Sequence, residues 1–323
     1  MLASLALVAL LLPAPAVSQH ADAMPSYLID PIPAWTTARR LWNITEPISA
    51  RQARIIRLHW AHGAAGLAVT KELVYVRVWK GGNNAIRANL RARNVARVPD
   101  DGLERCAFTF VREPFEHFAS GLNELEWRLT YAKKHHRGDA MPFTSLAVGS
   151  VARARQFVRD LVALEWMSTA ADSPQIGEED EAETALVARA AVAGDGGLAE
   201  SFDDNFLAFE HVRPMSGYAA SIAPTFVGRL ERFETDWGRL QAACGITLPA
   251  FKHDCVNCRH PSSKDPLGAY NATRALLATD VLVVRTLCLL LLADFRLFQY
   301  PLPRACAALD GRRRPRRGGD GQK

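Results

Sequence analysis

The sequence of 323 residues lacks the features that mark several large classes of protein. Beyond its first residues it has no apolar run long and clean enough for a polytopic membrane protein, and it has no internal repeat. Its 49% hydrophobic and 23% charged residues exclude a disordered chain, a collagen-like repeat and a coiled coil. The Gly-x4-Gly-Lys-Ser/Thr order of a Walker A loop is missing, which disfavours a nucleotide kinase. The length and composition favour one large α/β domain, or one and a half.

A strong excess of charge is also missing from the body of the chain. The formal net charge is +5, and the segment from Asp310 to Lys323 holds six basic and two acidic side chains, and therefore +4 of it. That segment is rich in arginine and glycine and has no apolar periodicity, so we assign residues 304–323 to a disordered basic tail. Nothing else on the chain indicates a nucleic-acid partner.

The chain opens with an apolar segment from Leu2 to Leu12 that is followed by small residues. This pattern predicts a secretory signal peptide over residues 1–18, or a short uncleaved signal anchor that would attach the protein to a membrane. The sequons Asn43-Ile44-Thr45 and Asn271-Ala272-Thr273 agree with a lumenal, glycosylated protein. We therefore expect the secretory pathway.

The six cysteines allow many pairings, and the sequence does not choose among them. The motif Cys255-Val256-Asn257-Cys258 lies between two histidines, but the ligands are too crowded for the usual zinc spacing. A loop closed by a disulfide is the preferred interpretation. Cys288 lies in a run of leucines and is predicted to be a buried free thiol.

Two strand–loop–helix units stand out along the chain. Residues 73–78 form a nearly continuous apolar run that predicts a buried strand, followed by two glycines and a helix from about Ala85. Residues 106–111 predict a second buried strand, and Pro114 suits the first turn of the helix that follows.

The remaining chain divides into further predicted elements. We expect a leader over residues 19–70, a helix over 151–167 and an acidic insertion at about 170–184. The stretch from Thr225 leads into a helix with Phe233, Trp237 and Leu240, and Thr279 to Phe298 predicts one long apolar helix. Charged residues within that last helix favour a core helix over a membrane span.

Both strand–loop–helix units could hold an anion. Lys80, Gly81 and Gly82 lie just before a helix N-terminus, where a lysine and free backbone N–H groups can bind a phosphate. The alternative is a tight turn between a strand and a helix. In the second unit, Arg112 at a strand end and Ser120 on the next helix could hold another phosphate, although such residues are usually found on the surface.

At this point five blocks of sequence, in order, resemble the Golgi carbohydrate sulfotransferases of the chondroitin 4-O and HNK-1 type, which use the sulfate donor PAPS. The blocks are Val74-Tyr75-Val76-x3-Lys80-Gly81-Gly82-Asn83-Asn84, Arg112-Glu113-Pro114-Phe115-x4-Ser120-x3-Glu124, Glu210-His211-Val212-Arg213-Pro214, Val227-Gly228-Arg229-Leu230-Glu231 with Asp236, and Leu292-Ala293-Asp294-Phe295-x2-Phe298-x-Tyr300. Together they span about residues 73–300.

The resemblance implies an α/β fold, with a parallel sheet flanked by helices, of the P-loop-like sulfotransferase type that binds PAPS, over residues 71–303. It implies transfer of a sulfuryl group from PAPS to a hydroxyl of a glycan or proteoglycan acceptor. The product is PAP, and no metal is needed. The expected location is the Golgi lumen or Golgi membrane, or alternatively outside the cell.

The resemblance also implies roles for single residues. Lys80 would neutralise charge on the bridging oxygen of the 5′-phosphate, and Arg112 with Ser120 would anchor the 3′-phosphate. His211 is the first candidate for the general base and Glu210 the second, although His211 could instead be structural. The residues implied at the 5′-phosphosulfate loop are Gly81, Gly82, Asn83 and Asn84.

The sequence departs from the family pattern at several positions. Asn84 stands where the family usually has Ser or Thr, and Val212 replaces a tryptophan. The paired cysteines that commonly follow the histidine are absent from residues 217–223. The acceptor region is therefore expected to be rebuilt. A catalytically inactive relative that binds a glycan or nucleotide is the alternative function.

Overall fold

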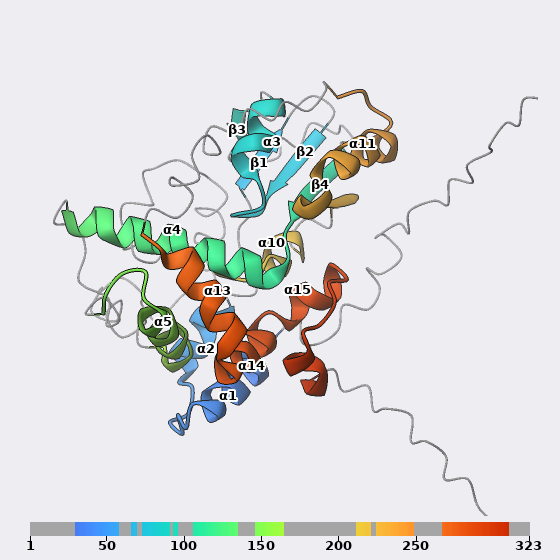
Figure 1. Ribbon diagram of the computed structural model, residues 1–323. Helices are drawn as coiled ribbons and strands as arrows, with labels where there is room; N and C mark the ends of the chain where they lie inside the picture. Colours follow the sequence, from blue (N-terminus) through green and yellow to red (C-terminus); the bar gives the residue numbers. More distant parts are fainter. Residues whose placement is uncertain are drawn as a thin grey trace, which may run out of the picture.

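The computed structural model of the protein is an α/β fold in which a sheet lies between two groups of helices (Figure 1). The residues that it describes are 30–57, 66–69, 73–90, 93–95, 106–134, 146–164, 211–220, 224–248 and 267–309.

The sheet has five strands in the order β3-β1-β2-β4-β5. The strands β2, β4 and β5 are parallel, whereas β1 is antiparallel to both β2 and β3. The expectation of a parallel sheet flanked by helices therefore holds for the part that contains β2, β4 and β5, and the sheet as a whole is mixed. The strands are β1 (Gly66–Val69), β2 (Leu73–Arg77), β3 (Arg93–Val95), β4 (Cys106–Val111) and β5 (Phe226–Arg229).

Helices cover both faces of the sheet (Figure 1). On one face lie α3 (Asn83–Leu90) and α11 (Phe233–Cys244). On the other, α4 (Pro114–Lys134) separates the sheet from a group of helices. That group contains α1 (Ile32–Leu41), α2 (Ala50–Ile56), α5 (Val151–Ala163), α13 (Ala269–Thr279) and α14 (Val281–Leu290). The short elements are α10 (Ser216–Ala220), η6 (Leu230–Arg232), α15 (Leu292–Leu297) and η7 (Arg304–Leu309).

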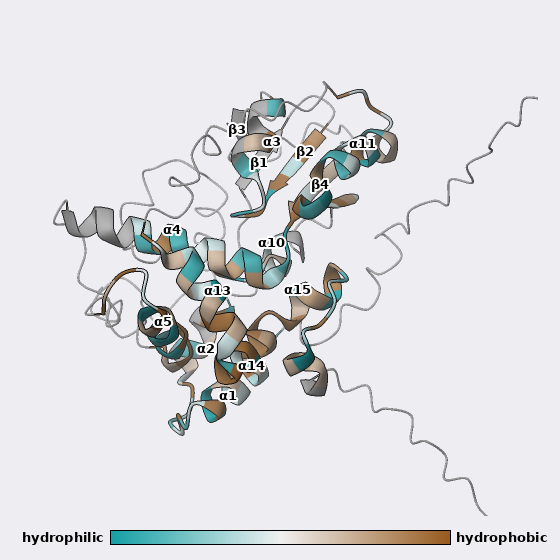
Figure 2. Ribbon diagram, in the orientation of Figure 1, coloured by the Kyte–Doolittle hydropathy of each residue, from teal (hydrophilic) through white to brown (hydrophobic). Residues whose placement is uncertain are grey.

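Alternation along β2 builds a core on each side of the sheet. Leu73 and Tyr75 pack toward α3 and α11, whereas Val74 and Val76 pack toward α4 and the helices beyond it. Side chains of successive strand residues point to opposite faces, so a strand covered on both sides is apolar throughout. Figure 2 shows this as brown colour along β2, and α14 is also brown. The continuous apolar run in the sequence is explained by this two-sided burial.

Several predicted elements are confirmed, with small shifts at their ends. Both buried strands are present, the loop helix begins at Asn83, and Pro114 opens α4. The prediction of one long helix over 279–298 is wrong, because α14 ends at Leu290 and α15 begins at Leu292 within that region. The start of α14 has a clear local cause: Asp280 is extended and its carboxylate accepts a hydrogen bond from the N–H of Val283 at 3.1 Å, which caps the helix. The break at Leu291 lies inside a continuous apolar run, which gives no sign of it.

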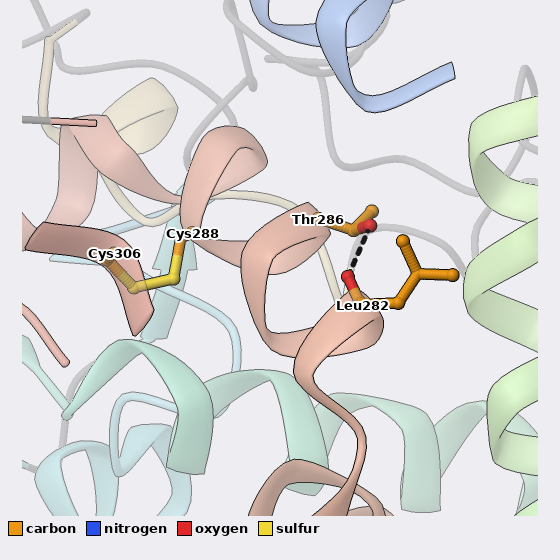
Figure 3. The surroundings of a disulfide bond; sticks show 4 residues. All are labelled: Leu282, Thr286, Cys288 and Cys306. Carbon is orange, nitrogen blue, oxygen red and sulfur yellow. Dashed lines mark hydrogen bonds between the residues drawn. A yellow bond between two sulfur atoms is a disulfide. The ribbon is translucent and has the colours of Figure 1, made fainter. Parts of the chain in front are cut away.

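Two disulfides join distant parts of the described chain. Cys106 at the start of β4 is bonded to Cys244 at the end of α11. Cys288 on α14 is bonded to Cys306 in η7 (Figure 3). The prediction that Cys288 is a free thiol is therefore wrong, since its partner lies beyond the leucine run that suggested a plain core position. The Cys255–Cys258 motif lies outside the described residues.

Part of the segment predicted as a leader belongs to the core. Trp35 and Ala38 on α1 are fully buried, and Arg39 donates to the carbonyl oxygens of Val162 and Ala163 at the end of α5. Within the described ranges, no helix combines the length and the apolar character needed to cross a membrane. The apolar N-terminal segment, the acidic insertion and residues 310–323 of the predicted basic tail lie outside those ranges. The prediction that residues 304–309 also belong to the disordered tail is wrong, because they form η7, in which the buried Cys306 is bonded to Cys288.

Candidate functional site

The candidate site lies at the carboxyl ends of the parallel strands. After β2 comes the loop of residues 78–82, after β4 comes Arg112, and after β5 comes η6. Because parallel strands end at the same edge of a sheet, these three connections are neighbours. This edge is where α/β proteins generally bind ligands.

The loop after β2 is tightly folded against β4. Lys80 has a left-handed backbone, with φ of 60°, and the N–H of Gly81 donates to the Val78 carbonyl at 3.0 Å. A Cβ at Gly81 would lie 2.5 Å from the Phe110 carbonyl oxygen, so only glycine fits there. The loop ends at α3, where Asn83 accepts a hydrogen bond from the Tyr75 hydroxyl at 2.5 Å. The predicted glycine loop that leads into a helix is therefore confirmed.

Lys80 contacts the helix that carries the second predicted unit. Its Nζ lies 2.8 Å from Oε2 of Glu124 on α4. Glu116, Ser120 and Glu124 are spaced four residues apart and therefore share one face of α4, and Ser120 is partly buried. The structure thus brings Lys80 and Ser120 to the same stretch of helix.

Arg112 is held at the first turn of this face. Its Nη2 lies 3.4 Å from Oε2 of Glu116, and its backbone N–H contacts the sulfur of Met215 at 3.4 Å. Both Lys80 and Arg112 are partly buried, and each is paired with a carboxylate of α4. The two cations predicted to bind the donor phosphates therefore lie along one face of α4, and each contacts a carboxylate of that face.

His117 links α4 to the loop from the opposite side. It is fully buried, and its Nε2 lies 2.9 Å from the carbonyl oxygen of Trp79, the residue before Lys80. Burial, together with the charges of Arg112 and Lys80, lowers the pKa of His117 to about 4, against the hydrogen bond with Trp79, which raises it. The neutral ring can donate its Nε2–H to that carbonyl.

His211 also lies beside the loop. It is buried, and its ring centroid is 4.7 Å from that of Trp79. Its backbone presses on α4, because a Cβ at Gly121 would lie 2.0 Å from the His211 carbonyl oxygen. The structure therefore brings His211 close to the Lys80 loop. Glu210 lies outside the described residues, and of Asn84 only the position in α3 is described.

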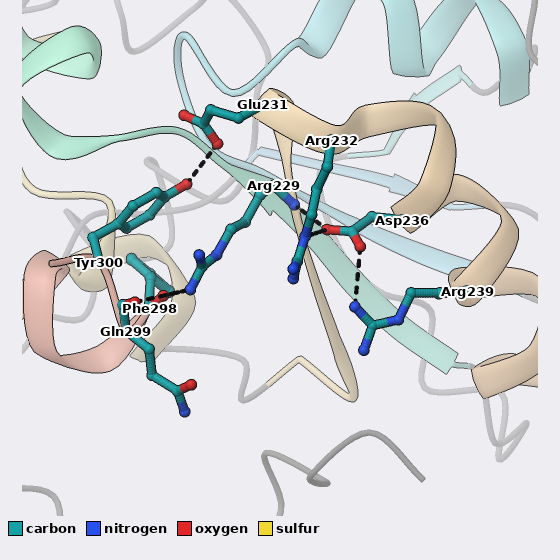
Figure 4. Close-up of polar contacts among 8 residues, drawn as sticks. All are labelled: Arg229, Glu231, Arg232, Asp236, Arg239, Phe298, Gln299 and Tyr300. Carbon is teal, nitrogen blue, oxygen red and sulfur yellow. Dashed lines mark hydrogen bonds and ion pairs between the residues drawn. The ribbon is translucent and has the colours of Figure 1, made fainter. Parts of the chain in front are cut away.

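The fourth and fifth sequence blocks also meet at this edge (Figure 4). Arg229 donates through Nη2 to the carbonyl oxygens of Phe298 at 2.6 Å and Gln299 at 3.0 Å. Tyr300 donates its hydroxyl to Glu231 at 2.9 Å. The other carboxylate oxygen of Glu231 accepts from the N–H of Glu113 at 2.6 Å. The end of the chain is thereby joined to the strand ends.

Charges crowd together where β4 and β5 end. Burial raises the pKa of the Glu113 carboxyl, and the nearby carboxylates of Glu116 and Glu231 raise it further, against backbone hydrogen bonds that lower it. Below η6, the buried Asp236 accepts from the N–H of Arg229 and pairs with Arg232 and Arg239 (Figure 4). That cluster fixes the turn out of β5.

Asp294 ties the last block to the segment that carries His211. Its two oxygens accept hydrogen bonds from the N–H groups of Met215 at 2.9 Å and Ser216 at 2.7 Å. Asp294 is fully buried, and this burial raises its pKa to about 6, even though those hydrogen bonds favour the charged form. The carboxyl group therefore holds the start of α10 against α15.

Sequence reasoning missed several residues of this edge. Glu124 belongs to the second sequence block but was given no role, and Glu116 could have been found from its four-residue spacing to Ser120, which places all three on one helix face. Tyr270 and Arg274 on α13 reach Glu116 from another part of the chain, and no motif indicates them. In the described part of the chain, no group of three or more His, Cys, Asp or Glu side chains could hold a metal ion.

Comparison with known proteins adds no relative. No family model, no curated protein and no solved structure matches the chain.

Proposed function

We propose that the protein transfers a sulfuryl group from PAPS to a hydroxyl of a carbohydrate acceptor, on a PAPS-binding fold of the sulfotransferase type. One observation carries the proposal: the Lys80–Glu124 ion pair joins the glycine loop to the helix that bears Ser120 and directly follows Arg112. Two anion-binding devices that are separate in the sequence thus face a common helix. The hydrogen bonds that join the other sequence blocks to this edge support the same proposal.

In the proposed reaction the acceptor oxygen attacks the sulfur of PAPS. The bond between sulfur and the bridging oxygen of the 5′-phosphate breaks, and the products are a sulfate ester and PAP. Lys80 stabilises the charge that develops on the bridging oxygen, while backbone N–H groups of Gly82 and of the first turn of α3 bind the phosphate. The N–H of Gly81 instead holds the loop together through its bond to Val78. Arg112 and Ser120 bind the 3′-phosphate. His211, or Glu210, takes the proton of the acceptor hydroxyl.

The carboxylates that now pair with Lys80 and Arg112 must give way to the donor. Partly exposed ion pairs contribute about 1 kcal/mol or less to stability. Hydrogen bonds between charged groups and phosphate contribute roughly 1.5–3 kcal/mol each. The balance therefore favours the phosphate. Until it binds, Glu116 and Glu124 keep the two cations in position.

We place the reaction in the lumen of the secretory pathway, most simply in the Golgi. The apolar N-terminal segment and the sequon at Asn43 support this location. Asn43 and Thr45 are both exposed, so an oligosaccharide at that sequon would not disturb the core. At the second sequon the Thr273 hydroxyl is buried and donates to the Ala269 carbonyl at 2.8 Å.

The proposal is tested by binding and by transfer. At a concentration of about 100 times its Kd, PAP should stabilise the fold by about 2.7 kcal/mol, which raises the unfolding temperature. Radiolabelled PAPS with a panel of glycans should then yield a labelled glycan. Stabilisation by PAP without transfer to any acceptor would favour the inactive, nucleotide-binding alternative. Absence of any stabilisation by PAP or PAPS would overturn the proposal.

A further inference from the structure

A single carboxylate on α4 joins side chains from two helices. Oε1 of Glu116 lies 3.2 Å from Nε of Arg274, and Oε2 lies 3.4 Å from Nη2 of Arg112. The Tyr270 hydroxyl also donates to Oε2. Tyr270 and Arg274 are one helical turn apart on α13, which packs along α4. Two guanidinium groups therefore approach one carboxylate from different sides.

The three side chains Arg112, Glu116 and Arg274 together carry one net positive charge, because two arginines share one carboxylate. The Glu113 carboxylate also lies at the start of α4, where it accepts from the N–H of Glu116. Burial and the nearby Glu116 carboxylate raise the pKa of Tyr270, which therefore stays a neutral hydroxyl donor. Of the side chains, 27% of Arg112 and 59% of Arg274 is exposed, so both remain accessible to an anion from solvent.

We propose that α13 supplies the second half of a binding site for a phosphate monoester, in which Arg274 binds the same phosphate as Arg112 and Ser120. A carboxylate and a phosphate group are of similar size, so two guanidinium groups that reach one carboxylate can also reach one phosphate. The phosphate carries more charge and accepts paired hydrogen bonds from arginine, which favours it over the partly exposed carboxylate. Glu116 is then a positioning residue that keeps both arginines together.

The inference rests on the proposed function, because the phosphate concerned is the 3′-phosphate of the donor. It adds a residue that lies far along the chain from the Arg112–Ser120 motif. It also gives a reason for specificity. With two arginines at this phosphate, adenosine nucleotides that lack a 3′-phosphate should bind much more weakly than PAP.

The test compares PAP with AMP, which differs only in lacking the 3′-phosphate. Their Kd values would be measured by calorimetry at constant salt for the wild type and for Arg274→Ala, Arg274→Lys and Arg239→Ala. Arg239 is the control, because it is also an exposed arginine that lies 3.2 Å from a carboxylate, here Asp236 on α11. Unfolding temperatures of all variants would confirm that they fold.

We expect Arg274→Ala to weaken PAP binding about tenfold or more and to leave AMP binding nearly unchanged. Arg274→Lys should lose less, and Arg239→Ala should bind PAP like the wild type. Equal PAP binding by wild type and Arg274→Ala would overturn the inference and leave the proposed function standing. Equal weakening of PAP and AMP would also overturn it. A wild-type protein that does not bind PAP would overturn the proposed function itself, before any variant is made.

Discussion

Individual side chains hold the Lys80 loop in place, some by charge and some by packing. Lys80 is held by Glu124, while Trp79, the residue before it, is held by His117 and lies against His211. An ion pair orients the cation without neutralising it permanently, since partly exposed pairs exchange easily. The lysine is thus the residue whose loss should affect chemistry most directly.

Lys80→Ala should lower kcat for sulfuryl transfer by about 100-fold or more, because the charge on the leaving oxygen would lose its cation. Steady-state kinetics with PAPS and the best acceptor would measure this change. Arg239→Ala serves as the control variant and should keep the wild-type kcat. A Lys80→Ala variant with normal kcat would remove Lys80 from the chemical step.

Two buried groups, His117 and Asp294, should change the free energy of unfolding in opposite directions as pH falls. The pKa of His117 falls from 6.5 to about 4 on folding, so its contribution lowers stability as pH falls from 6.5 to 4. The pKa of Asp294 rises from 3.8 to about 6, so its contribution raises stability as pH falls from 6 to 3.8. Each contribution is on the order of 3 kcal/mol. In the wild type they should nearly cancel between pH 6 and 4.

Single substitutions should reveal each dependence. Urea unfolding between pH 7 and 4 would be measured for His117→Gln, in which the amide can still donate to the Trp79 carbonyl, and for Asp294→Asn. Relative to Asp294→Asn, the His117→Gln variant should gain stability as the solution becomes more acidic. Parallel curves for the two variants would contradict the assigned pKa shifts.

At the scale of elements, the loop after β2 depends on close backbone contact with β4. The Phe110 carbonyl lies where a side chain at Gly81 would begin. The loop therefore packs directly on the β4 backbone, with no room for a side chain between them. Strand, loop and helix act as one unit, and α4 closes it through Glu124 and His117.

Gly81→Ala should cost roughly 1–3 kcal/mol of stability and weaken PAP binding, because the loop must shift away from the Phe110 backbone. Denaturant unfolding and calorimetry would measure the two effects. Gly238→Ala is a matched control: it lies on α11, no atom stands within 4 Å of the added Cβ, and alanine favours a helix. That control should be neutral or slightly stabilising. Equal stability of both variants would show that the loop is not constrained.

At the scale of the whole molecule, distant segments are joined around the sheet. The disulfide from Cys106 to Cys244 connects residues 138 apart, and the disulfide from Cys288 to Cys306 connects residues 18 apart. Helix α1 packs against both α5 and α14, so the beginning and end of the described chain share a core. The free energy of unfolding should therefore depend on these disulfides and helix contacts, which join different elements.

Replacing Cys106 and Cys244 together by alanine should lower the free energy of unfolding by about 5 kcal/mol at most, because a long loop in the unfolded chain is no longer closed. Urea unfolding would measure the loss. Thiol labelling of the denatured, unreduced wild type provides the control and should leave these cysteines unlabelled. Labelling of both would show that the bond is absent.

The sequence by itself determined the two strand–loop–helix units, because two-sided burial makes a strand apolar throughout and glycine and proline mark its connections. It also placed Lys80, Arg112 and Ser120 correctly at strand ends and on the following helix. It failed at Leu291, where α14 and α15 divide an apparently continuous helix, and at Cys288, whose partner lies outside the local pattern.

Only the tertiary structure decided which side chains meet. The approach of Arg274 to Glu116 depends on how α13 packs along α4, and the approach of His211 to Trp79 depends on how its segment crosses Gly121. Local sequence encodes the preferences of a few neighbouring residues, whereas these contacts join segments roughly a hundred residues or more apart through the shape of the core. The sequence thus indicates that an anion could bind at this edge, and the fold determines which cations and carboxylates surround it.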